Sequence, residues 1–192
     1  MSPCRPVYAT GVKVFGKLDP AARTVLDTLV ERTRGGAVPR RLASRSSTPF
    51  PSSNDLERTL VAPFADAGFA HHHSVKHART GQSFEFNFFN ANLGVAVEIM
   101  GYRADDEIWK DVLKFHVHAD TRVGVVWVPR WKWISGTRSD ANHHAAIKAL
   151  AFAEDHLDLE ALVAVSYDWE PGSDAAWRLV YPFAMGEQTT SA

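Results

Sequence analysis

The sequence predicts an α/β fold in which helices flank a mixed β-sheet, and three observations support this prediction. Of the 192 residues, 45% are hydrophobic, which is enough to build the core of one ordinary domain. From residue 54 onward, helix-like and strand-like patterns follow in the order α-β-β-β-α-β-α-β-β. The segment FEFNFFNANLGVAVEIMG has the alternation of two strong neighbouring strands.

The N-terminal segment predicts a strand or hairpin at residues 7–15, followed by a helix. Asp19 is at the N-cap position, Pro20 is at the first helical position, and Gly35-Gly36 follows the last turn. Residues 37–54 are rich in Pro, Ser and Arg and indicate a linker. We therefore expect an N-terminal helix and basic linker at residues 1–53 and an α/β domain at residues 54–192.

Later elements carry start and stop signals of their own. Asn54 and Asp105 are the expected helix caps, Gly68 is expected to end the first of these helices, and Pro129 to end a buried strand. The expected elements are helices at about 54–68, 105–118 and 140–157 and strands at 69–77, 83–90, 93–101, 123–128, 162–167 and 177–183.

The composition excludes several classes of protein. The chain has 21 Lys and Arg against 22 Asp and Glu, a formal net charge of −1, so neither a wholly basic nucleic-acid coat nor an acidic disordered tail is expected. A single cysteine excludes an internal disulfide and a Cys-rich zinc site. Because no apolar run approaches the roughly 20 residues of a membrane span, we expect a soluble cytoplasmic protein.

The two strong strands predict a hairpin with one acidic face. Phe84, Phe86 and Phe88 alternate with Glu85 and Asn87. On the second strand, four apolar residues alternate with small or polar ones; the two sets are Leu93, Val95, Val97, Ile99 and Gly94, Ala96, Glu98, Met100.

A two-residue loop at Ala91-Asn92 would align the apolar faces of the two strands. The same register would place Glu85 directly opposite Glu98, and facing carboxylates repel each other. A divalent cation, a bridging Lys or Arg, or a shared proton could compensate that repulsion. The alternative is a solvated face on which water screens both charges.

The element order and the run VAVEIMG…EIWKDVLKF…RVGVVWVP resemble the PD-(D/E)XK nuclease superfamily, in particular its restriction-endonuclease-like members. The resemblance covers roughly residues 54–168. It implies a restriction-endonuclease-like mixed sheet with an α-β-β-β-α-β core, and cleavage of DNA phosphodiester bonds that depends on Mg²⁺ or Mn²⁺.

The resemblance also implies a site on the hairpin. Glu98 takes the central acidic position, and Glu57 takes the position on the preceding helix. The Asp position of the superfamily falls at Asn87 or Glu85, so Glu98 and Glu85 are the expected metal ligands. The Lys position falls at Met100, which cannot bind a hard cation or activate water.

A lysine from another element could replace the one missing at residue 100. Lys76 on the neighbouring strand is the candidate that we include in the expected site. Lys110 and Lys114 lie on the helix after the hairpin, but the helical wheel directs Lys114 away from the buried side. Asp111 lies at the edge of the buried stripe and is better placed.

Two further features have structural alternatives. Glu57 is three residues after Asn54, so a capping box would explain it without catalysis. Along a strand, His71, His73 and His77 share a face and could bind zinc, whereas histidines on a polar strand can also be surface residues or contact phosphate.

The candidate nucleic-acid surface combines basic and aromatic residues after the 123–128 strand. Its members are Arg130, Trp131, Lys132 and Trp133. Interleaved cations and indoles suit phosphates and bases. The alternative is that the Trp pair forms a wall of the core.

The leading hypothesis is a metal-dependent DNA endonuclease, with a homodimer through the 20–33 helix as an expectation from analogy. A catalytically inactive binder of DNA or of a protein is the first alternative, favoured by Asn87 and Met100. The second is an interaction protein that shares the fold and binds no nucleic acid. The chain has no GxxxxGK[ST], GxGxxG or GxSxG motif that would indicate a nucleotide-dependent motor, a Rossmann enzyme or an α/β-hydrolase.

Overall fold

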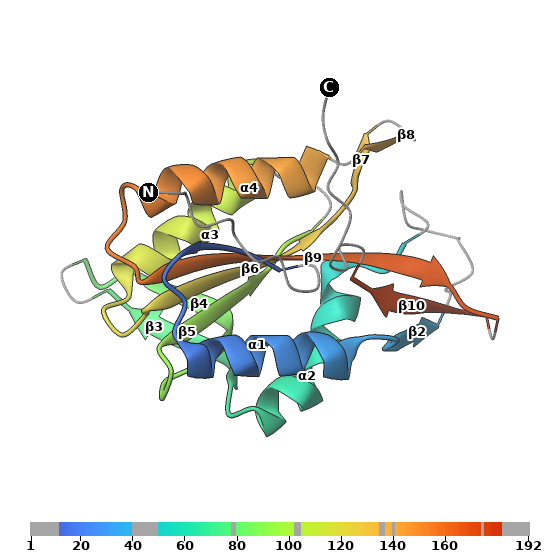
Figure 1. The fold of residues 1–192 in the computed structure, drawn as a ribbon, viewed down its shortest axis with the longest axis horizontal. Coiled ribbons are helices and arrows are strands. Elements are labelled where there is room, and N and C mark those ends of the chain that lie inside the picture. Colours follow the sequence, from blue (N-terminus) through green and yellow to red (C-terminus); the bar gives the residue numbers. More distant parts are fainter. Residues whose placement is uncertain are drawn as a thin grey trace, which may run out of the picture.

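A mixed sheet of eight strands lies between two pairs of helices in the computed structural model (Figure 1). The structure describes residues 12–39, 50–77, 80–101, 105–134, 137–139, 141–173 and 175–181. The helices are α1 (Pro20–Thr33), α2 (Ser53–Asp66), α3 (Asp105–Val117) and α4 (Ala141–Glu154). The strands are β1 (Val12–Gly16), β2 (Ala37–Pro39), β3 (Ala70–Lys76), β4 (Ser83–Asn90), β5 (Val95–Ile99), β6 (Val123–Pro129), β7 (Lys132–Ile134), β8 (Thr137–Ser139), β9 (Ala161–Pro171) and β10 (Ala176–Val180).

The centre of the sheet is parallel and its flanks are antiparallel. The strand order is β2-β10-β9-β6-β5-β4-β3, with β5, β6 and β9 parallel to one another. Every residue of β6 is buried, as expected for a strand covered on both faces. Strand β1 pairs with the first half of β9, on the same edge that β10 occupies along the second half.

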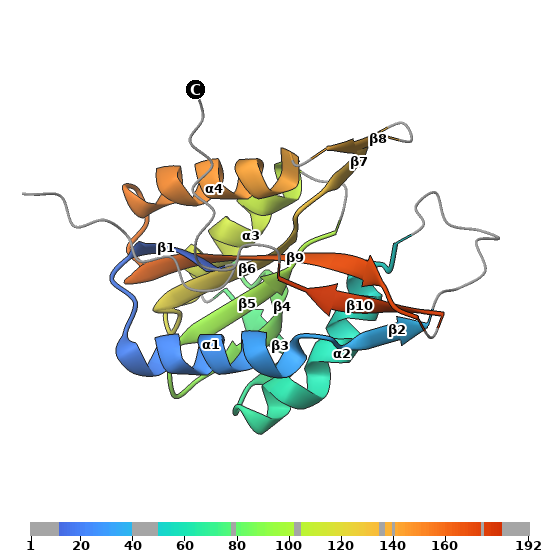
Figure 2. The ribbon, with the colours of Figure 1, turned by 45° about the vertical axis from the view of Figure 1, so that its right-hand side comes forward.

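Each face of the sheet has its own hydrophobic core (Figures 1 and 2). Helices α1 and α2 cover one face with side chains that include Leu26 and Leu56. Helices α3 and α4 cover the other with side chains that include Phe115 and Leu150. None of the helices within the described ranges is long and apolar enough to cross a membrane.

The N-terminal segment contributes to this sheet and core. Helix α1 has the predicted cap, since the Asp19 carboxylate accepts a hydrogen bond from the Ala21 N–H at 2.8 Å. The apolar stripe of α1 is buried, so the surface predicted for a partner chain faces the protein's own core. The boundary predicted at residues 53/54 therefore does not separate two hydrophobic cores, and most of the predicted linker (40–49) lies outside the described residues, as do 7–11 of the first predicted strand.

The predicted order of elements from residue 54 is observed, with one addition. A short hairpin of β7 and β8 separates β6 from α4 and projects beyond α4 (Figure 1). Residues 182–183, which the last predicted strand includes, lie outside the described part of the chain.

The predicted register of the β4–β5 hairpin is wrong by two residues. Phe88 pairs with Val97 and Asn90 with Val95, so four residues form the turn. The even loop length keeps the predicted faces of β5, but a wider turn moves Glu85 away from the position opposite Glu98. Gly94 permits this turn with a φ of +62°.

Strand β4 also departs from simple alternation. Phe86 packs in the α3/α4 core and Phe88 in the α1/α2 core, although residues two apart on a regular strand share a face. The irregularity is between these two residues, where the β3–β4 register has no pair joining His72 to Asn87. His72 itself has a φ of +53°.

Candidate active site

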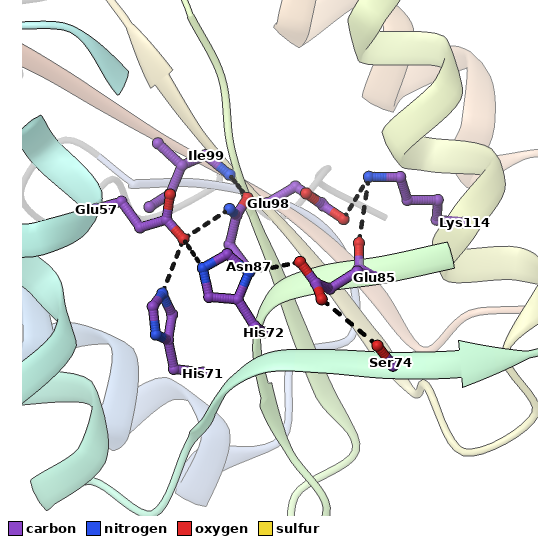
Figure 3. A network of polar contacts seen from close by, with 9 residues as sticks. All are labelled: Glu57, His71, His72, Ser74, Glu85, Asn87, Glu98, Ile99 and Lys114. Carbon is purple, nitrogen blue, oxygen red and sulfur yellow. Dashed lines mark hydrogen bonds and ion pairs between the residues drawn. The ribbon is translucent and has the colours of Figure 1, made fainter. Parts of the chain in front are cut away.

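The predicted acidic residues lie where β3, β4 and β5 meet helices α2 and α3 (Figure 3). Two clusters of polar contacts occupy this region. We call the first the lysine cluster; it consists of Glu98, Asp111 and Lys114. We call the second the histidine cluster; it consists of Glu57, His71, His72 and Glu85.

Glu98 on β5 is the buried acid of the lysine cluster. Its side chain is 6% exposed, and its Oε1 accepts a hydrogen bond from Lys114 Nζ at 2.8 Å. Burial raises the pKa of Glu98 to about 8, with a further increase from the negative charge of Asp111, while Lys114 opposes the shift. A buried carboxylate with a second acid beside it is a place where added positive charge is favoured.

Lys114 on α3 supplies the cation beside Glu98, so the helical-wheel prediction that it projects away from the site is wrong. Its Nζ also lies 3.0 Å from Asp111 Oδ1 and donates to the Glu85 backbone oxygen at 3.4 Å. The wheel locates the Cβ atom, whereas a four-carbon stem can run along the helix flank and bring its ammonium group to the site.

The surroundings of Lys114 favour the charged form of its ammonium group. Burial on its own would lower the pKa of Lys114, but the carboxylates of Glu98 and Asp111 raise it above the ordinary value. The Asp111–Lys114 spacing of three residues on one helix is the sequence signal that could have indicated this pair.

Asn87 connects the two clusters. Its Oδ1 accepts the Ile99 N–H at 2.8 Å and its Nδ2 donates to Glu57 Oε1 at 3.1 Å. The observed register, continued one step beyond the Phe88–Val97 pair, sets Asn87 rather than Glu85 opposite Glu98. In Figure 3, Asn87 lies between Glu57 and Glu98.

Glu57 belongs to the histidine cluster and does not cap its helix. The N-cap of α2 is Ser52, whose side chain accepts the Asp55 N–H while Asp55 accepts the Ser52 N–H. The predicted capping box of Asn54 and Glu57 is therefore wrong by two residues. Glu57 lies in the next turn of α2, where its carboxylate points to β3.

His72 joins the two carboxylates of the histidine cluster. Its Nε2 lies 3.1 Å from Glu57 Oε1, and its Nδ1 makes a short hydrogen bond with Glu85. The bond with Glu85 is the main reason that the pKa of His72 is raised, and it lowers the pKa of Glu85. The Glu85 side chain is 46% exposed and also accepts from the Ser74 hydroxyl.

The histidines that converge differ from those predicted. His71 Nε2 contacts Glu57 Oε1 at 2.8 Å, beside His72. His73 stacks on Phe89, and His77 contacts the hydroxyl of Thr80. The prediction that residues 71, 73 and 77 share a site is wrong, because the left-handed backbone at His72 interrupts the strand alternation on which it depended.

Lys76 lies at the far end of β3. It is exposed and pairs in register with Ser83, two residues before Glu85 along β4. Among the described residues, the cation in contact with Glu98 is Lys114.

The candidate nucleic-acid surface begins where β6 ends. The Arg130 guanidinium lies over the Trp131 ring, 4.5 Å from its centroid, and the indole N–H of Trp131 donates to Asp168 Oδ2 at 2.6 Å. Lys132 and Trp133 lie on β7, which pairs with β8. The structure gives the backbone of these two residues, and their side chains lie outside the description.

Comparisons with known proteins agree with this architecture. The family described as "Putative halobacteria restriction endonuclease" matches residues 29–167. The crystal structure of restriction endonuclease BglII complexed with a DNA 16-mer is similar, with a TM-score of 0.55 over 83% of this chain and 78% of that chain. The two sequences are 10% identical, so this likeness bears on the fold alone. No curated protein matches the sequence.

The predicted restriction-endonuclease-like fold is therefore confirmed. The family match covers more than half of the chain, begins inside α1 and ends inside β9, so it includes both clusters of the candidate site. The chain belongs to the family described as "Putative halobacteria restriction endonuclease".

Proposed function

We propose that the protein is a metal-dependent endonuclease that cleaves DNA phosphodiester bonds, with Mg²⁺ or Mn²⁺ as its cofactor. The observation that carries the proposal is the buried Glu98 carboxylate with Lys114 Nζ at 2.8 Å. A buried acid and a cation are the two functions that the superfamily assigns to its acidic and Lys positions. Here the cation comes from α3, because Met100 occupies the Lys position and is 2% exposed.

The donor set fits a hard divalent cation. Glu98 and Glu85 are the proposed ligands, and Asn87 offers an amide oxygen that has a second lone pair beyond the one used by Ile99. Burial, with a smaller contribution from the negative charge of Asp111, raises the pKa of Glu98 to about 8, and a cation bound beside Glu98 would favour its carboxylate form. A bound Mg²⁺ supplies polarisation of the scissile phosphate and a lowered pKa for a water nucleophile.

The residues around Glu98 have separate roles in the proposal. Lys114 keeps its proton in the presence of two carboxylates and so carries positive charge next to the place where phosphate charge develops. Asn87 fixes β4 against β5 through Ile99 and orients Glu57 through its Nδ2. Glu57 is an accessory residue, and Lys76 is the alternative source of the cation.

DNA contact is proposed at the end of β6. Arg130 and Trp131 present a stacked guanidinium and indole, and Trp131 is held by Asp168. Arg and Trp in this arrangement can contact phosphate and base faces. Lys132 and Trp133 on β7 extend the proposed surface in the chain direction.

Cleavage of supercoiled plasmid tests the proposal directly. Wild-type protein should nick or cut plasmid DNA with Mg²⁺ or Mn²⁺ and lose that activity in EDTA. Glu98→Ala should abolish the metal-dependent activity, while Glu170→Ala, at an exposed position near the end of β9, serves as the matched control. Activity that survives Glu98→Ala would contradict the site, and no cutting across several DNAs with either metal would contradict the enzyme.

The second candidate function is a catalytically inactive binder of DNA or of a protein partner. The Met at residue 100 favours it, as does the Glu98–Lys114 ion pair, which is complete without a metal. Salt-dependent DNA affinity without cleavage would support this alternative for DNA. A chain that neither cuts nor binds DNA would instead point to a protein partner.

The homodimer belongs to the proposal as an expectation from the superfamily, since cutting both strands in one event requires two sites. Sedimentation velocity of the full chain, alone and with duplex DNA, tests it. A monomer under both conditions would contradict the dimer and leave nicking of single strands as the proposed activity.

A further inference from the structure

Two consecutive histidines of β3 reach the same carboxylate oxygen, which a regular strand does not allow. His71 Nε2 and His72 Nε2 lie 2.8 and 3.1 Å from Glu57 Oε1. Neighbouring residues on a strand normally point to opposite faces. Here the φ of +53° at His72 turns its ring to the side of His71, and the β3–β4 register omits the pair at this residue.

A positive φ is unfavourable for a residue with a side chain and persists where its surroundings enforce it. The departure at His72 has one visible consequence, which is that two imidazole nitrogens and one carboxylate oxygen converge. These three ligand atoms lie within 4.8 Å of one another. Figure 3 shows the rings of His71 and His72 both directed to the Glu57 side chain.

The surrounding contacts hold both rings in this orientation. The His71 ring stacks on Phe88, with centroids 5.1 Å apart. The second nitrogen of His72 is bonded to Glu85, which itself accepts from Ser74. A carboxylate on the far nitrogen is the usual support of a metal-binding histidine, because it fixes the tautomer and raises the basicity of the nitrogen that faces the ion.

The donor chemistry distinguishes this cluster from the position at Glu98. Two imidazoles and one carboxylate suit Zn²⁺ and similar borderline ions, which take nitrogen ligands in tetrahedral sites. Mg²⁺ prefers oxygen ligands and usually keeps several waters. The histidine side chains are 34% and 49% exposed, so an ion can enter from solvent and keep a fourth, open position.

We propose that Glu57, His71 and His72 form a binding site for Zn²⁺ or a similar borderline divalent ion, next to the magnesium position proposed at Glu98. Glu85 is common to both proposals, because it supports His72 here and is a proposed ligand there. The ion would take the place of the protons that now link both imidazoles to Glu57 and would tie α2 to β3. This inference goes beyond the nuclease proposal and does not depend on DNA cleavage.

Calorimetric titration of the metal-free full chain with Zn²⁺, in an excess of Mg²⁺, measures this site. We expect one equivalent of Zn²⁺ to bind, and Co²⁺ in its place to give the strong visible absorption of a four-coordinate ion. His71→Gln and His72→Gln should each weaken Zn²⁺ binding by about 100-fold or more, and Glu85→Gln by about 10-fold.

Two matched variants test whether the site is the one proposed. His77→Gln changes another histidine of the same strand region, one that contacts Thr80, and should leave Zn²⁺ affinity unchanged. Glu98→Gln should leave it within a few-fold of wild type, because its carboxylate contacts Lys114 instead. Thermal unfolding of each variant checks the fold, and His71→Gln remains informative if His72→Gln does not fold.

The inference fails if no Zn²⁺ binds, if both His71→Gln and His72→Gln bind as wild type does, or if His77→Gln removes the binding. These outcomes are distinct from failure of the nuclease proposal. A protein that binds Zn²⁺ through His71 and His72 but does not cut plasmid would overturn the nuclease alone. A protein that cuts plasmid with Mg²⁺ but binds no Zn²⁺ would overturn the zinc site alone.

Discussion

Each of the two clusters of the site places one basic side chain between two carboxylates, but the surroundings of the clusters differ. In the lysine cluster, one ammonium group bridges the carboxylates of Glu98 and Asp111. In the histidine cluster, one imidazole bridges the carboxylates of Glu57 and Glu85. Glu98 is 6% exposed and Glu85 is 46% exposed, and burial accounts for the main difference in behaviour. The pKa of Glu98 is raised, whereas that of Glu85 is lowered.

This difference indicates which positive charge is permanent and which is exchangeable. Lys114 keeps its proton at neutral pH, because the carboxylates of Glu98 and Asp111 outweigh burial and raise its pKa from an already high ordinary value. His72 titrates from an ordinary value of 6.5, so its proton can be lost or replaced near neutral pH. The lysine cluster is therefore suited to hold charge during a reaction, and the histidine cluster to exchange one cation for another.

Removal of the lysine charge should have the largest effect on activity. Lys114→Met keeps the length of the stem but leaves Glu98 and Asp111 without their shared cation. We expect the rate of plasmid cleavage at saturating Mg²⁺ to fall by about 100-fold or more, the effect typical of losing one group that stabilises developing charge. Initial rates of nicking, measured at several Mg²⁺ concentrations, separate this loss from weaker metal binding.

Lys76→Met is the matched control, since Lys76 is exposed and pairs with Ser83 away from Glu98. It should change the cleavage rate by less than about threefold if Lys114 supplies the reacting cation. The reverse result would be a wild-type cleavage rate for Lys114→Met and no cleavage by Lys76→Met. It would assign the reacting cation to Lys76 on β3, as the sequence first predicted.

Glu98 should make the metal-free protein less stable as the pH rises. Its pKa is about 8 in the folded protein against an ordinary value of 4.5, so the folded state holds a proton that the unfolded state has lost. The resulting stabilisation is complete below about pH 4.5 and is lost as the pH rises to about 8. Its slope cannot exceed about 1.4 kcal/mol per pH unit for one proton.

Urea unfolding in EDTA, at intervals between these pH values, measures this effect as the difference between wild type and Glu98→Gln. The wild-type free energy of unfolding should decline relative to that of the variant as the pH increases. With the series extended below pH 4.5, Glu85→Gln should show the opposite sign there, because the lowered pKa of Glu85 stabilises the wild-type folded state above the ordinary value of 4.5, and this stabilisation is lost as the pH falls below that value. The same sign for both variants would contradict the comparison between the clusters.

Local sequence signals were sufficient to predict the helices and the longer strands in their order, but not the three-residue strands β2, β7 and β8. The Asp19 cap, Pro20 and the Gly35-Gly36 stop define α1, because capping depends on a few neighbouring residues. The faces of β5 also followed from alternation. The register of the hairpin did not, because two-residue and four-residue loops both align the apolar faces, and the choice depends on how β5 packs against β6.

The site was also predicted only in part, because some of its residues depend on more than the local sequence pattern. Glu98, Glu57, Glu85 and Asn87 were identified from the hairpin and its resemblance, and the structure brings all four to one region. Lys114 and the His71–His72 pair were missed because each reaches the site by a departure from regular geometry. One depends on a long flexible stem and the other on a left-handed residue within a strand.

Gly124 on β6 offers a way to disturb the lysine cluster alone. A Cβ atom at this position would lie 2.4 Å from Phe115 Cδ2, and Phe115 is the neighbour of Lys114 on α3. Gly124→Ala should force α3 away from the sheet and destabilise the protein by about 1–3 kcal/mol. Urea unfolding measures this loss.

The displacement should also reduce Mg²⁺-dependent cleavage, while Zn²⁺ binding by Glu57, His71 and His72 should persist, since none of these residues lies on α3. Gly101→Ala is the control for stability, because its Cβ would meet Ser53 Oγ at an ordinary 3.7 Å. Equal destabilisation by the two substitutions would show that close packing under α3 is not the cause.

The smallest effect on stability should come from substitution of His118. It has the same side chain as His72, but it packs among aromatic rings. It is 10% exposed and lies against the Phe86 and Phe89 rings, and burial lowers its pKa below 6.5. Asp120 opposes this shift from 3.9 Å, while His73 on β3 adds to it.

On acidification the unfolded chain binds this proton first, so the stability that neutral His118 contributes is present above pH 6.5 and is lost as the pH falls below it. His118→Gln should flatten the acid side of the stability curve. NMR titration of the histidine ring protons gives the direct comparison, with His72 titrating above 6.5 and His118 below it. If both titrate on the same side of 6.5, then burial does not set the direction of the histidine pKa shifts, and the contrast between buried and exposed groups that underlies the comparison of the two clusters is contradicted.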